Sequence, residues 1–274
     1  RPYPRPQEVK MPADQPQPVA MTIAGSDSGG GAGIQADLKT FQAFGVYGTS
    51  AITAITAQNT LGVHAIHAVP IQDVRAQIDA VATDLRPRAL KTGMLANAAL
   101  VAEVADAIEV HALGHYVMDP VMVATSGDRL LDSDAEASLV VRLLPLATLI
   151  TPNLHEAAIL VGEPVETVGH MSEAARRLVA LGAGAALIKG GHLGGDVVDV
   201  LWDGDEESVW RRPRIQTTHT HGTGCTLSAA IAAGLALGES VHDAVARGIR
   251  LVVRAIETAP GVGGGHGPLH HSVS

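Results

Sequence analysis

Aromatic residues are scarce in this chain: two Trp, three Tyr and two Phe amount to 3% of its 274 residues. Hydrophobic residues nevertheless make up 46% of the chain, which is enough for a core of ordinary size. That core must therefore consist mainly of Ala, Val, Leu and Ile side chains rather than of packed rings.

Cysteine, net positive charge and long apolar runs are lacking as well. The single cysteine, Cys225, excludes a disulfide framework within the chain and a cysteine-rich zinc site, and it is typical of a reducing compartment. The net charge of −9 argues against nucleic acid or an anionic membrane as the main partner. No apolar run reaches the length of a membrane-spanning helix. We therefore expect a cytoplasmic protein that binds neither nucleic acid nor membrane.

The first residues differ in composition from the rest of the chain. Residues 1–18 are rich in Pro and Gln and have no apolar core of the kind found in signal peptides, so we predict a disordered N-terminal extension. Between residues 19 and 260 there is no linker, internal repeat or low-complexity segment. We expect residues 19–274 to form a single domain.

Short apolar runs alternate with segments of helical periodicity along this domain. We predict strands at 19–24, 47–57, 63–69, 89–92, 116–118, 148–150, 185–188, 197–202 and 208–214, with 63–69 at an edge. We predict helices at 34–44, 71–85, 98–112, 135–144, 156–161, 172–181, 226–237 and 241–259. This alternation is typical of an α/β fold with a mostly parallel sheet and helices on both faces.

Polar and glycine-rich clusters follow the predicted strands. They lie at 25–33, 58–59, 93–94, 119–128, 151–156, 189–192 and 220–225. Ligands bind beyond the carboxyl ends of the strands in sheets of this kind. The clusters therefore predict one active-site face.

The most informative of these clusters is Thr-His-Gly-Thr-Gly-Cys-Thr at 220–226, which leads into an alanine-rich helix. Gly222 and Gly224 let the backbone approach a ligand closely. The helix start adds free N–H groups and the positive end of its dipole, so we expect an anion there, most naturally a phosphate. Local electrostatics at this position favour a thiolate at Cys225.

Several familiar motifs are absent. The segment 31–36 fits a loose dinucleotide fingerprint, but no acidic residue occurs between Asp37 and Asp73, where that motif requires one. The Gly-Lys-Ser/Thr of a P-loop and the G-x-S-x-G elbow of a hydrolase do not occur. His64 and His67 point to opposite faces of their predicted strand, so we interpret them as surface or packing residues.

Eight segments occur together in a characteristic order. They are 24–39, 57–60, 91–95, 119–122, 125–128, 151–157, 188–192 and 220–226. Together they closely resemble the hydroxymethylpyrimidine/phosphomethylpyrimidine kinases of thiamine biosynthesis, in the ribokinase-like superfamily. The resemblance runs from about residue 19 to His270 and His271. It implies a three-layer sandwich, ATP-dependent phosphorylation of 4-amino-5-hydroxymethyl-2-methylpyrimidine and then of its monophosphate, Mg²⁺, and a homodimer.

The resemblance assigns the pyrimidine site to Gly25, Asp37, Gln58, Met94 and Val121. The amide of Gln58 is able to read the donor and acceptor edge of a heterocycle, although a strand-end residue of this type also caps backbone groups. Asp37 is placed to accept a hydrogen bond from the substrate hydroxyl. A solvated carboxylate on a helix face is the alternative.

The resemblance also implies how the phosphoryl group is handled. The loop at 222–225 surrounds the moving phosphoryl group with Gly222, Gly224 and Cys225 as catalytic residues. Many ribokinase-like enzymes carry Asp as the general base where this chain and the pyrimidine kinases have Cys225. Whether Cys225 is a base or a positioning group stays open, and a small buried helix-start residue is the alternative.

Further polar residues are implied for nucleotide and metal. Lys189 is interpreted as a catalytic contact to phosphate rather than as a surface lysine. Glu156 and Asp119 are expected to hold Mg²⁺ through water, although Glu156 also suits a helix start. The contacts expected for the ATP phosphates are Thr125, Ser126, Thr223 and Asn153. An ordinary polar turn is the alternative for 125–127.

Pyridoxal is also a substituted heterocycle with a hydroxymethyl group. A pyridoxal kinase, or an enzyme with both activities, is therefore the nearest alternative. Sugar kinases of the superfamily fit less well, because they carry Asp where this chain has Cys225. A ligand-binding regulator without catalysis is a further alternative, against which Lys189, Glu156 and the anion loop argue.

Overall fold

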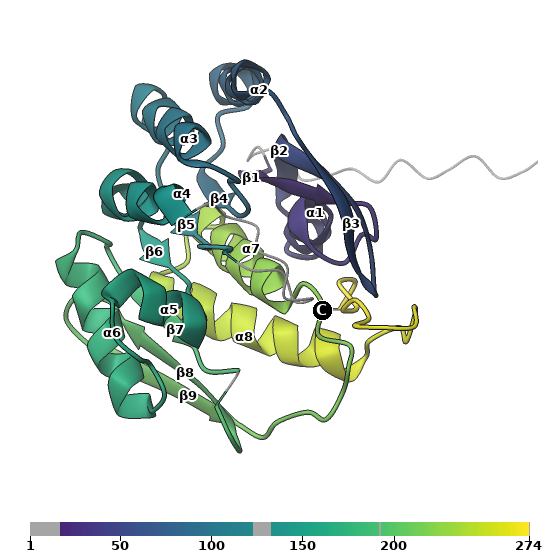
Figure 1. Cartoon of the computed structure of the whole chain (residues 1–274), viewed down its shortest axis with the longest axis vertical. Coiled ribbons are helices and arrows are strands. Elements are labelled where there is room, and N and C mark those ends of the chain that lie inside the picture. The colour runs from purple at the N-terminus through teal and green to yellow at the C-terminus, as the bar shows by residue number, and fades with distance from the viewer. Residues whose placement is uncertain (1–16, 123–132, 192, 274) are drawn as a thin grey trace, which may run out of the picture.

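The computed structural model describes residues 17–122, 133–191 and 193–273 (Figure 1). Nine strands among them form one sheet in the order β3-β2-β1-β4-β5-β6-β7-β8-β9. The strands are β1 Val19–Asp27, β2 Tyr47–Asn59, β3 Gly62–Ala68, β4 Ala89–Thr92, β5 Tyr116–Met118, β6 Leu149–Ile150, β7 Ala186–Lys189, β8 Val197–Trp202 and β9 Glu207–Arg212. Neighbours in this order pair in parallel from β2 through β1, β4, β5 and β6 to β7, whereas the pairs β3–β2, β7–β8 and β8–β9 are antiparallel. The predicted parallel sheet and its edge strand are confirmed.

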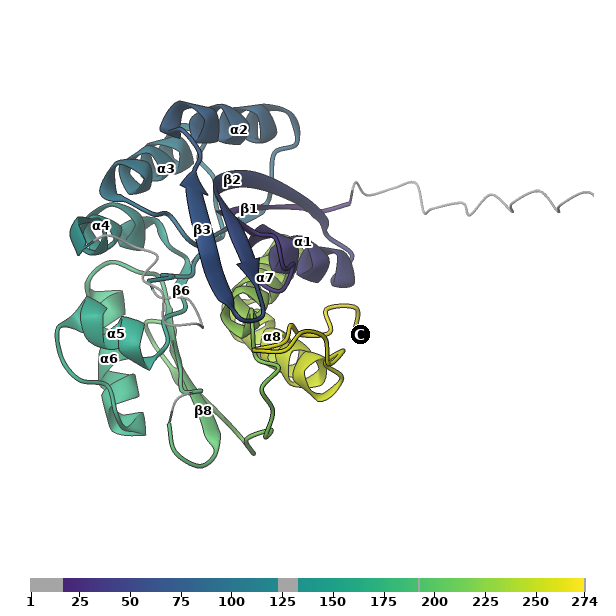
Figure 2. The ribbon, with the colours of Figure 1, turned by 45° about the vertical axis from the view of Figure 1, so that its right-hand side comes forward.

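Helices cover both faces of this sheet, as Figures 1 and 2 show. One face packs against α1 Gly33–Ala43, α7 Thr223–Ala236 and α8 Val241–Glu257. The other packs against α2 Ile71–Asp84, α3 Ala98–Val110, α4 Ser133–Ser138, α5 Leu154–Val161 and α6 Val168–Ala180. Each face therefore has its own hydrophobic core, and the predicted three-layer sandwich is confirmed.

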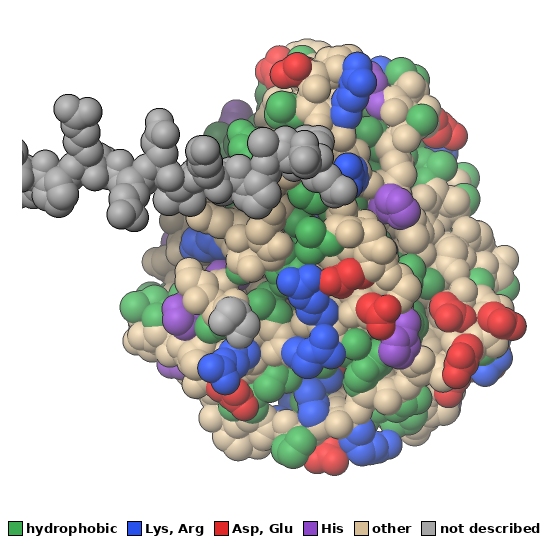
Figure 3. Space-filling model, turned by 180° about the vertical axis from the view of Figure 1, so that it is seen from behind, with side chains coloured by type: hydrophobic (Ala, Val, Ile, Leu, Met, Phe, Trp, Pro, Cys, Tyr) green, Lys and Arg blue, Asp and Glu red, His purple; other side chains and the backbone are tan. Residues whose placement is uncertain are grey.

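Both cores are aliphatic, as the composition predicts. Tyr116 and Phe41 are the aromatic residues among the largest fully buried side chains in the described part of the chain. Small residues let α7 lie deep between sheet and α8: every residue from Thr226 to Ala236 is buried. None of the helices in that part of the chain is long and apolar enough to cross a membrane. On the face shown in Figure 3, Lys and Arg side chains lie among Asp and Glu side chains.

Three predicted helices differ clearly from the observed ones, and one of them, predicted at 172–181, is α6 at Val168–Ala180. The helix expected at 135–144 is broken into α4, a π-helical turn at Leu139–Leu143 and a 3-10 turn at Leu144–Leu146. Pro145 explains the break, because its ring clashes with a carbonyl one turn earlier in a continuous α-helix. The helix expected from residue 226 begins at Thr223, so Gly224 and Cys225 lie in its first turn. Most of the predicted N-terminal extension, residues 1–16, lies outside the described residues.

Candidate active site

The polar clusters predicted to follow the strands meet at one edge of the sheet. Asp27 ends β1, Asp119 follows β5 and Lys189 ends β7. The start of α7 reaches the same edge, because His221 contacts Asp27 and Ser228 contacts Asp119. Residues from both halves of the chain therefore form one site.

Two glycine-rich loops touch through their backbones at this edge. Gly222 is the N-cap of α7 with φ +82°, in the left-handed region that favours glycine. A Cβ atom at Gly222 would overlap the carbonyl oxygen of Gly31 in the first loop. A Cβ atom at Gly224 would lie 3.2 Å from Lys189 Nζ. The missing side chains thus bring the helix start close to the first loop and to a lysine.

Lys189 and Asp119 form a partly buried ion pair in front of this helix start. Lys189 Nζ donates to Asp119 Oδ1 at 3.0 Å, and Ser228 Oγ donates to Asp119 Oδ2 at 3.1 Å. Burial alone lowers the pKa of Lys189, but attraction by Asp119 and Glu156 outweighs it and raises that pKa. Lys189 therefore remains positively charged beside the loop expected to bind phosphate.

Asp37 is not a solvated carboxylate on a helix face; that alternative is wrong. The side chain is fully buried, and Lys91 Nζ lies 3.0 Å from both of its oxygens. Thr22 Oγ1 donates to Asp37 Oδ2 at 2.6 Å. Burial opposes the charge on Lys91, but attraction by Asp37 outweighs it and raises the pKa of Lys91. Both carboxylate oxygens of Asp37 thus already have protein partners.

The expected thiolate at Cys225 is wrong for this state of the protein. Cys225 is half-buried, and burial raises the pKa of its thiol to about 11. Lys91 lowers that pKa, whereas the carboxylates of Asp37 and Asp119 raise it further. The thiol therefore stays protonated at pH 7. The helix start is therefore not sufficient to ionise Cys225.

Asn153 and Glu156 form a capping box at the start of α5. Glu156 N donates to Asn153 Oδ1 at 3.0 Å, and Asn153 N donates to Glu156 Oε2 at 2.8 Å. Burial raises the pKa of Glu156 to about 7, with Lys189 lowering it and Asp119 raising it. The helix-start interpretation of Glu156 is thus confirmed, and its carboxylate also accepts a hydrogen bond from the backbone of Met122.

The carboxylates of Asp119 and Glu156 suit a magnesium ion better than a metal that is coordinated by protein groups alone. No group of three or more His, Cys, Asp or Glu side chains in the described ranges is arranged to hold a metal. Mg²⁺ usually keeps several waters and takes one or two carboxylates plus substrate phosphates. Asp119 and Glu156, which both raise the pKa of Lys189, match that requirement.

The raised pKa of Glu156 predicts a pH-dependent stability in the absence of metal and nucleotide. Between its ordinary value of 4.5 and about 7, the folded state binds more protons at Glu156 than the unfolded state. This group therefore lowers the free energy of unfolding as pH rises through that window, by up to ~3 kcal/mol. Glu156→Gln, which retains the capping box, is expected to gain stability over the unmodified chain at pH 8 but not at pH 4.5.

Urea denaturation of both proteins at pH 4.5 and pH 8 measures this difference. Glu163→Gln is the control, because Glu163 is an exposed carboxylate just beyond the C-cap of α5 whose ion pair with Arg177 lies on the surface. An equal stability change for Glu156→Gln at both pH values would contradict the prediction.

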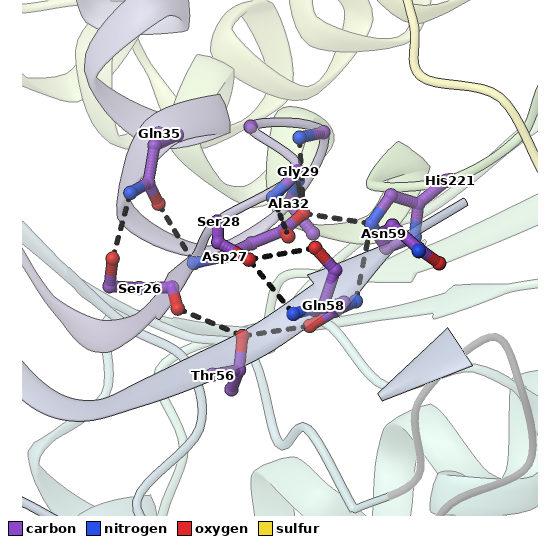
Figure 4. A network of polar contacts seen from close by, with 12 residues as sticks. Ser26, Asp27, Ser28, Gly29, Ala32, Gln35, Thr56, Gln58, Asn59 and His221 are labelled. Atoms are coloured by element: carbon purple, nitrogen blue, oxygen red, sulfur yellow. Dashed lines mark hydrogen bonds and ion pairs between the residues drawn. The ribbon is translucent and has the colours of Figure 1, made fainter. Parts of the chain in front are cut away.

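A polar network joins the ends of β1 and β2 to the residue before Gly222 (Figure 4). The Asp27 carboxylate accepts from the backbone N–H of Gly29, Gly31 and Ala32. His221 Nε2 lies 2.9 Å from Asp27 Oδ2 and 3.4 Å from the amide nitrogen of Gln58. Gln58, assigned to the substrate by sequence, therefore lies directly beside the start of α7.

The remaining predicted residues have varied surroundings. A Cβ atom at Gly25 would lie 3.6 Å from the Met94 sulfur, so these two positions are adjacent. Val121 is half-buried just beyond β5. Thr223 Oγ1 donates to the Thr220 carbonyl at 2.6 Å, which turns the hydroxyl toward its own loop. The two remaining candidates, Thr125 and Ser126, lie outside the described residues.

Sequence reasoning missed Asp27, His221, Lys91 and Ser228 as members of the site. Asp27 and His221 belong to the segments 24–39 and 220–226, but nothing local in the sequence indicates that they meet. Lys91 had a usable signal, since it is a lysine inside a short buried strand of a parallel sheet. A buried lysine requires a carboxylate partner, and Asp37 is that partner.

Known proteins resemble this chain over nearly its whole length. The family model for phosphomethylpyrimidine kinase matches residues 27–270. The hydroxymethylpyrimidine/phosphomethylpyrimidine kinase of Streptomyces coelicolor is 50% identical over 254 residues, covering 93% of this chain and 94% of that protein.

Solved structures are similar as well. A Bacillus subtilis pyridoxal kinase in complex with ADP has a TM-score of 0.88 and 41% identity, covering 94% of this chain and 98% of its own. The phosphomethylpyrimidine kinase of Clostridium difficile has a TM-score of 0.79 and 42% identity, covering 88% and 100%. With half of its residues identical to those of a named relative, and with the same fold and ordered motifs, this chain belongs to the hydroxymethylpyrimidine/phosphomethylpyrimidine kinase family of ribokinase-like phosphotransferases.

Proposed function

We propose that this chain transfers the γ-phosphoryl group of ATP to the hydroxymethyl group of 4-amino-5-hydroxymethyl-2-methylpyrimidine, and then phosphorylates the monophosphate to the diphosphate. One observation carries the proposal: the glycine-rich start of α7 lies between the Lys189–Asp119 pair and the Gln58 amide. A phosphate-binding element is thus adjacent to a group suited to reading a heterocycle. The names of the relatives point to the same reaction.

The described residues supply what phosphoryl transfer requires, which is positioning and neutralisation of charge. We propose that the backbone N–H groups of Gly222 and Gly224 contact the transferred group, with Lys189 as a point charge on its oxygens. Asn153 is proposed to orient the nucleotide phosphates from the start of α5. The ADP bound to the Bacillus subtilis relative supports an adenine nucleotide as co-substrate.

Asp119 and Glu156 are proposed to hold Mg²⁺ through water. Bound there, Mg²⁺ supplies positive charge to the nucleotide phosphates. Lys189 keeps Asp119 ionised, because the ammonium group lies 3.0 Å from Oδ1 and holds the pKa of this buried carboxyl below its usual value. The Asp119 carboxylate is thus ready for a cation at neutral pH.

We propose that Cys225 contacts the substrate hydroxyl during the first phosphorylation only. The Cys225 thiol is protonated in the unliganded protein, so this role requires that it lose its proton when substrate and Mg-ATP are bound. Cys225→Ala is then expected to lower kcat for the alcohol by about 10²-fold, as removal of a proton acceptor does. The monophosphate already presents an anionic oxygen, so its kcat is expected to change little. Steady-state kinetics with both substrates measure the difference. Equal losses with the two substrates, or none with the alcohol, would contradict a role for Cys225 in proton removal.

The pyrimidine pocket is proposed to include Gly25, Gln58, Met94 and Val121, with Asp37 acting through its partner Lys91. Adjacency of Gly25 to Met94 supports this grouping. Pyridoxal is the second candidate substrate, since pyridoxal kinases share this fold at 41% identity. The larger share of identical residues with the pyrimidine kinase favours the pyrimidine.

Turnover of Mg-ATP with hydroxymethylpyrimidine, its monophosphate and pyridoxal, assayed side by side, tests the proposed function. Phosphorylation of both pyrimidines is the expected result. Turnover of pyridoxal alone would replace the substrate and keep the phosphate chemistry. Absence of turnover with all three would overturn the enzyme assignment in favour of a ligand-binding regulator.

We also propose that two copies of the chain associate. The β2–β3 hairpin at the sheet edge exposes three large apolar side chains, Ile55, Leu61 and Ile66. Edge strands with exposed apolar residues are ready surfaces for pairing. Sedimentation equilibrium should return the mass of two chains, and a single-chain mass at micromolar concentration would contradict the homodimer.

A further inference from the structure

His221 lies at the junction of three segments that are far apart in the sequence. Its ring packs against Gly31 of the first loop, and its backbone N–H donates to the Gly267 carbonyl of the C-terminal segment at 3.1 Å. The residue is buried and immediately precedes Gly222. Figure 4 shows its ring directed toward Asp27 and the amide of Gln58. The protons on these groups decide what Gln58 presents to a ligand.

The Asp27 carboxylate determines that the Nε2 atom of His221 carries a proton. Three backbone N–H groups donate to the Asp27 carboxylate at 2.7, 3.0 and 2.9 Å. Burial raises the pKa of Asp27, but these donors together with His221 outweigh it and leave the pKa below its usual value. An ionised carboxylate only accepts hydrogen bonds. The His221 Nε2 atom, 2.9 Å from Oδ2, must therefore carry a proton.

Thr56 determines which atom of the Gln58 amide, nitrogen or oxygen, lies at the end away from His221. Thr56 Oγ1 lies 2.9 Å from the Ser26 carbonyl, which only accepts, so the single hydroxyl proton of Thr56 points to Ser26. The amide atom of Gln58 that lies 3.1 Å from Thr56 Oγ1 must then donate, which identifies it as the nitrogen. The amide atom nearest His221 must accept, which identifies it as the oxygen.

Donors and acceptors therefore assign one orientation to the Gln58 amide, related by a half-turn to the one drawn in Figure 4. The nitrogen lies toward Thr56, and the oxygen lies toward the Nε2–H that His221 shares with Asp27. No further side-chain partner of this amide is found among the described residues. One N–H and one oxygen lone pair remain for a ligand, in a fixed order.

We propose that His221 is a specificity-determining positioning residue, which holds the Gln58 amide in one orientation for the substrate ring and ties it to the phosphate loop. The proposal rests on the proposed function, in which Gln58 reads the pyrimidine. A pyrimidine with an amino group next to a ring nitrogen presents a donor beside an acceptor. A fixed amide matches only one order of these groups, whereas a freely rotating amide matches either.

Substitution of His221 tests this role by comparing its effect on the KM for the pyrimidine with its effect on the KM for ATP. His221→Phe keeps the ring and removes the donor, so the KM for hydroxymethylpyrimidine is expected to rise about tenfold. The KM for ATP is expected to stay within about twofold, because the Gly222 backbone is unchanged. His221→Gln places an amide N–H near the position of Nε2 and is expected to restore most of the substrate affinity.

A double-mutant cycle separates positioning from loop packing. The Gln58→Ala and His221→Phe changes are expected to be non-additive, so that the double variant is no worse than Gln58→Ala alone. Additive effects, or equal increases of KM for ATP and pyrimidine, would overturn the proposal and leave His221 as a packing residue of the loop.

A measurement without turnover keeps this proposal distinct from the proposed function. In the unmodified protein, the side-chain NH₂ protons of Gln58, assigned by their loss in Gln58→Ala, are expected to show a nuclear Overhauser effect to the Thr56 methyl group. An effect to the His221 ring instead would overturn the assigned orientation. The protein could show this signal and yet fail to phosphorylate the pyrimidine. That result would overturn the proposed substrate, while supporting the assigned orientation of the Gln58 amide beside His221.

Discussion

Gly222→Ala is expected to lower kcat/KM by about 10²-fold or more with every substrate, because it displaces the phosphate loop. The φ of +82° costs an L-residue about 1–2 kcal/mol. The added Cβ also overlaps the carbonyl oxygen of Gly31, which is backbone and is not free to rotate away. The strain is relieved only by separating the start of α7 from the first loop. That movement would take the N–H groups of Gly222 and Gly224 away from the position proposed for the phosphoryl group.

Steady-state kinetics and thermal denaturation of the Gly222→Ala protein check this expectation. Gly114→Ala is a suitable control, since no atom lies within 4 Å of the Cβ that it adds. Because α7 is buried along most of its length, the variant is expected to remain folded with a moderately lower melting temperature. Activity within about twofold of the unmodified chain would show that the close approach of the two loops is not required.

Lys189→Met is expected to lower kcat by about 10²–10³-fold with both pyrimidine substrates, the effect of removing one group that stabilises developing charge. The methionine retains the apolar stem of the lysine, so that the loss reports the ammonium group. Both phosphorylations transfer the same γ-phosphoryl group, so kcat is expected to fall by a similar factor for both. This distinguishes Lys189 from Cys225, whose removal is expected to affect only the alcohol.

The variant also leaves Asp119 without its ion-pair partner, although Ser228 still donates to that carboxylate. A control for loss of a cation is Arg88→Ala, since Arg88 is exposed beside the amino end of β4, away from the site. Kinetics should be measured well below the melting temperature of each variant. Unchanged kcat for Lys189→Met, or a loss with only one substrate, would contradict a phosphate contact.

Much of the fold was predictable because its signals are local. The predicted bounds of β4, β5 and β8 coincide with the observed ones. In each case a short apolar run is bounded by turn or helix-start residues, and pairing with the neighbouring strands neither lengthens nor shortens the strand. The predicted helix ended just before Pro145, but the break after α4 was missed because apolar periodicity continues through residues 139–144. The anion loop was predictable for the same reason, since its glycines and helix start are consecutive.

The chemistry of the site was less predictable, because it depends on partners distant in sequence. Lys91 and Asp37 are 54 residues apart, and His221 and Asp27 are 194 residues apart. The expected thiolate at Cys225 was wrong because a helix start is a local feature, whereas burial and neighbouring carboxylates are not.

By itself, the sequence of this protein determined the order of strands and helices, the aliphatic core, the glycine-rich anion loop and the family. Each of these depends on residue type and spacing along the chain. Only the tertiary structure decided which charges are paired, which thiol is protonated and how Gln58 is held. Those properties arise from desolvation and from hydrogen bonds between segments that meet only when the sheet has formed.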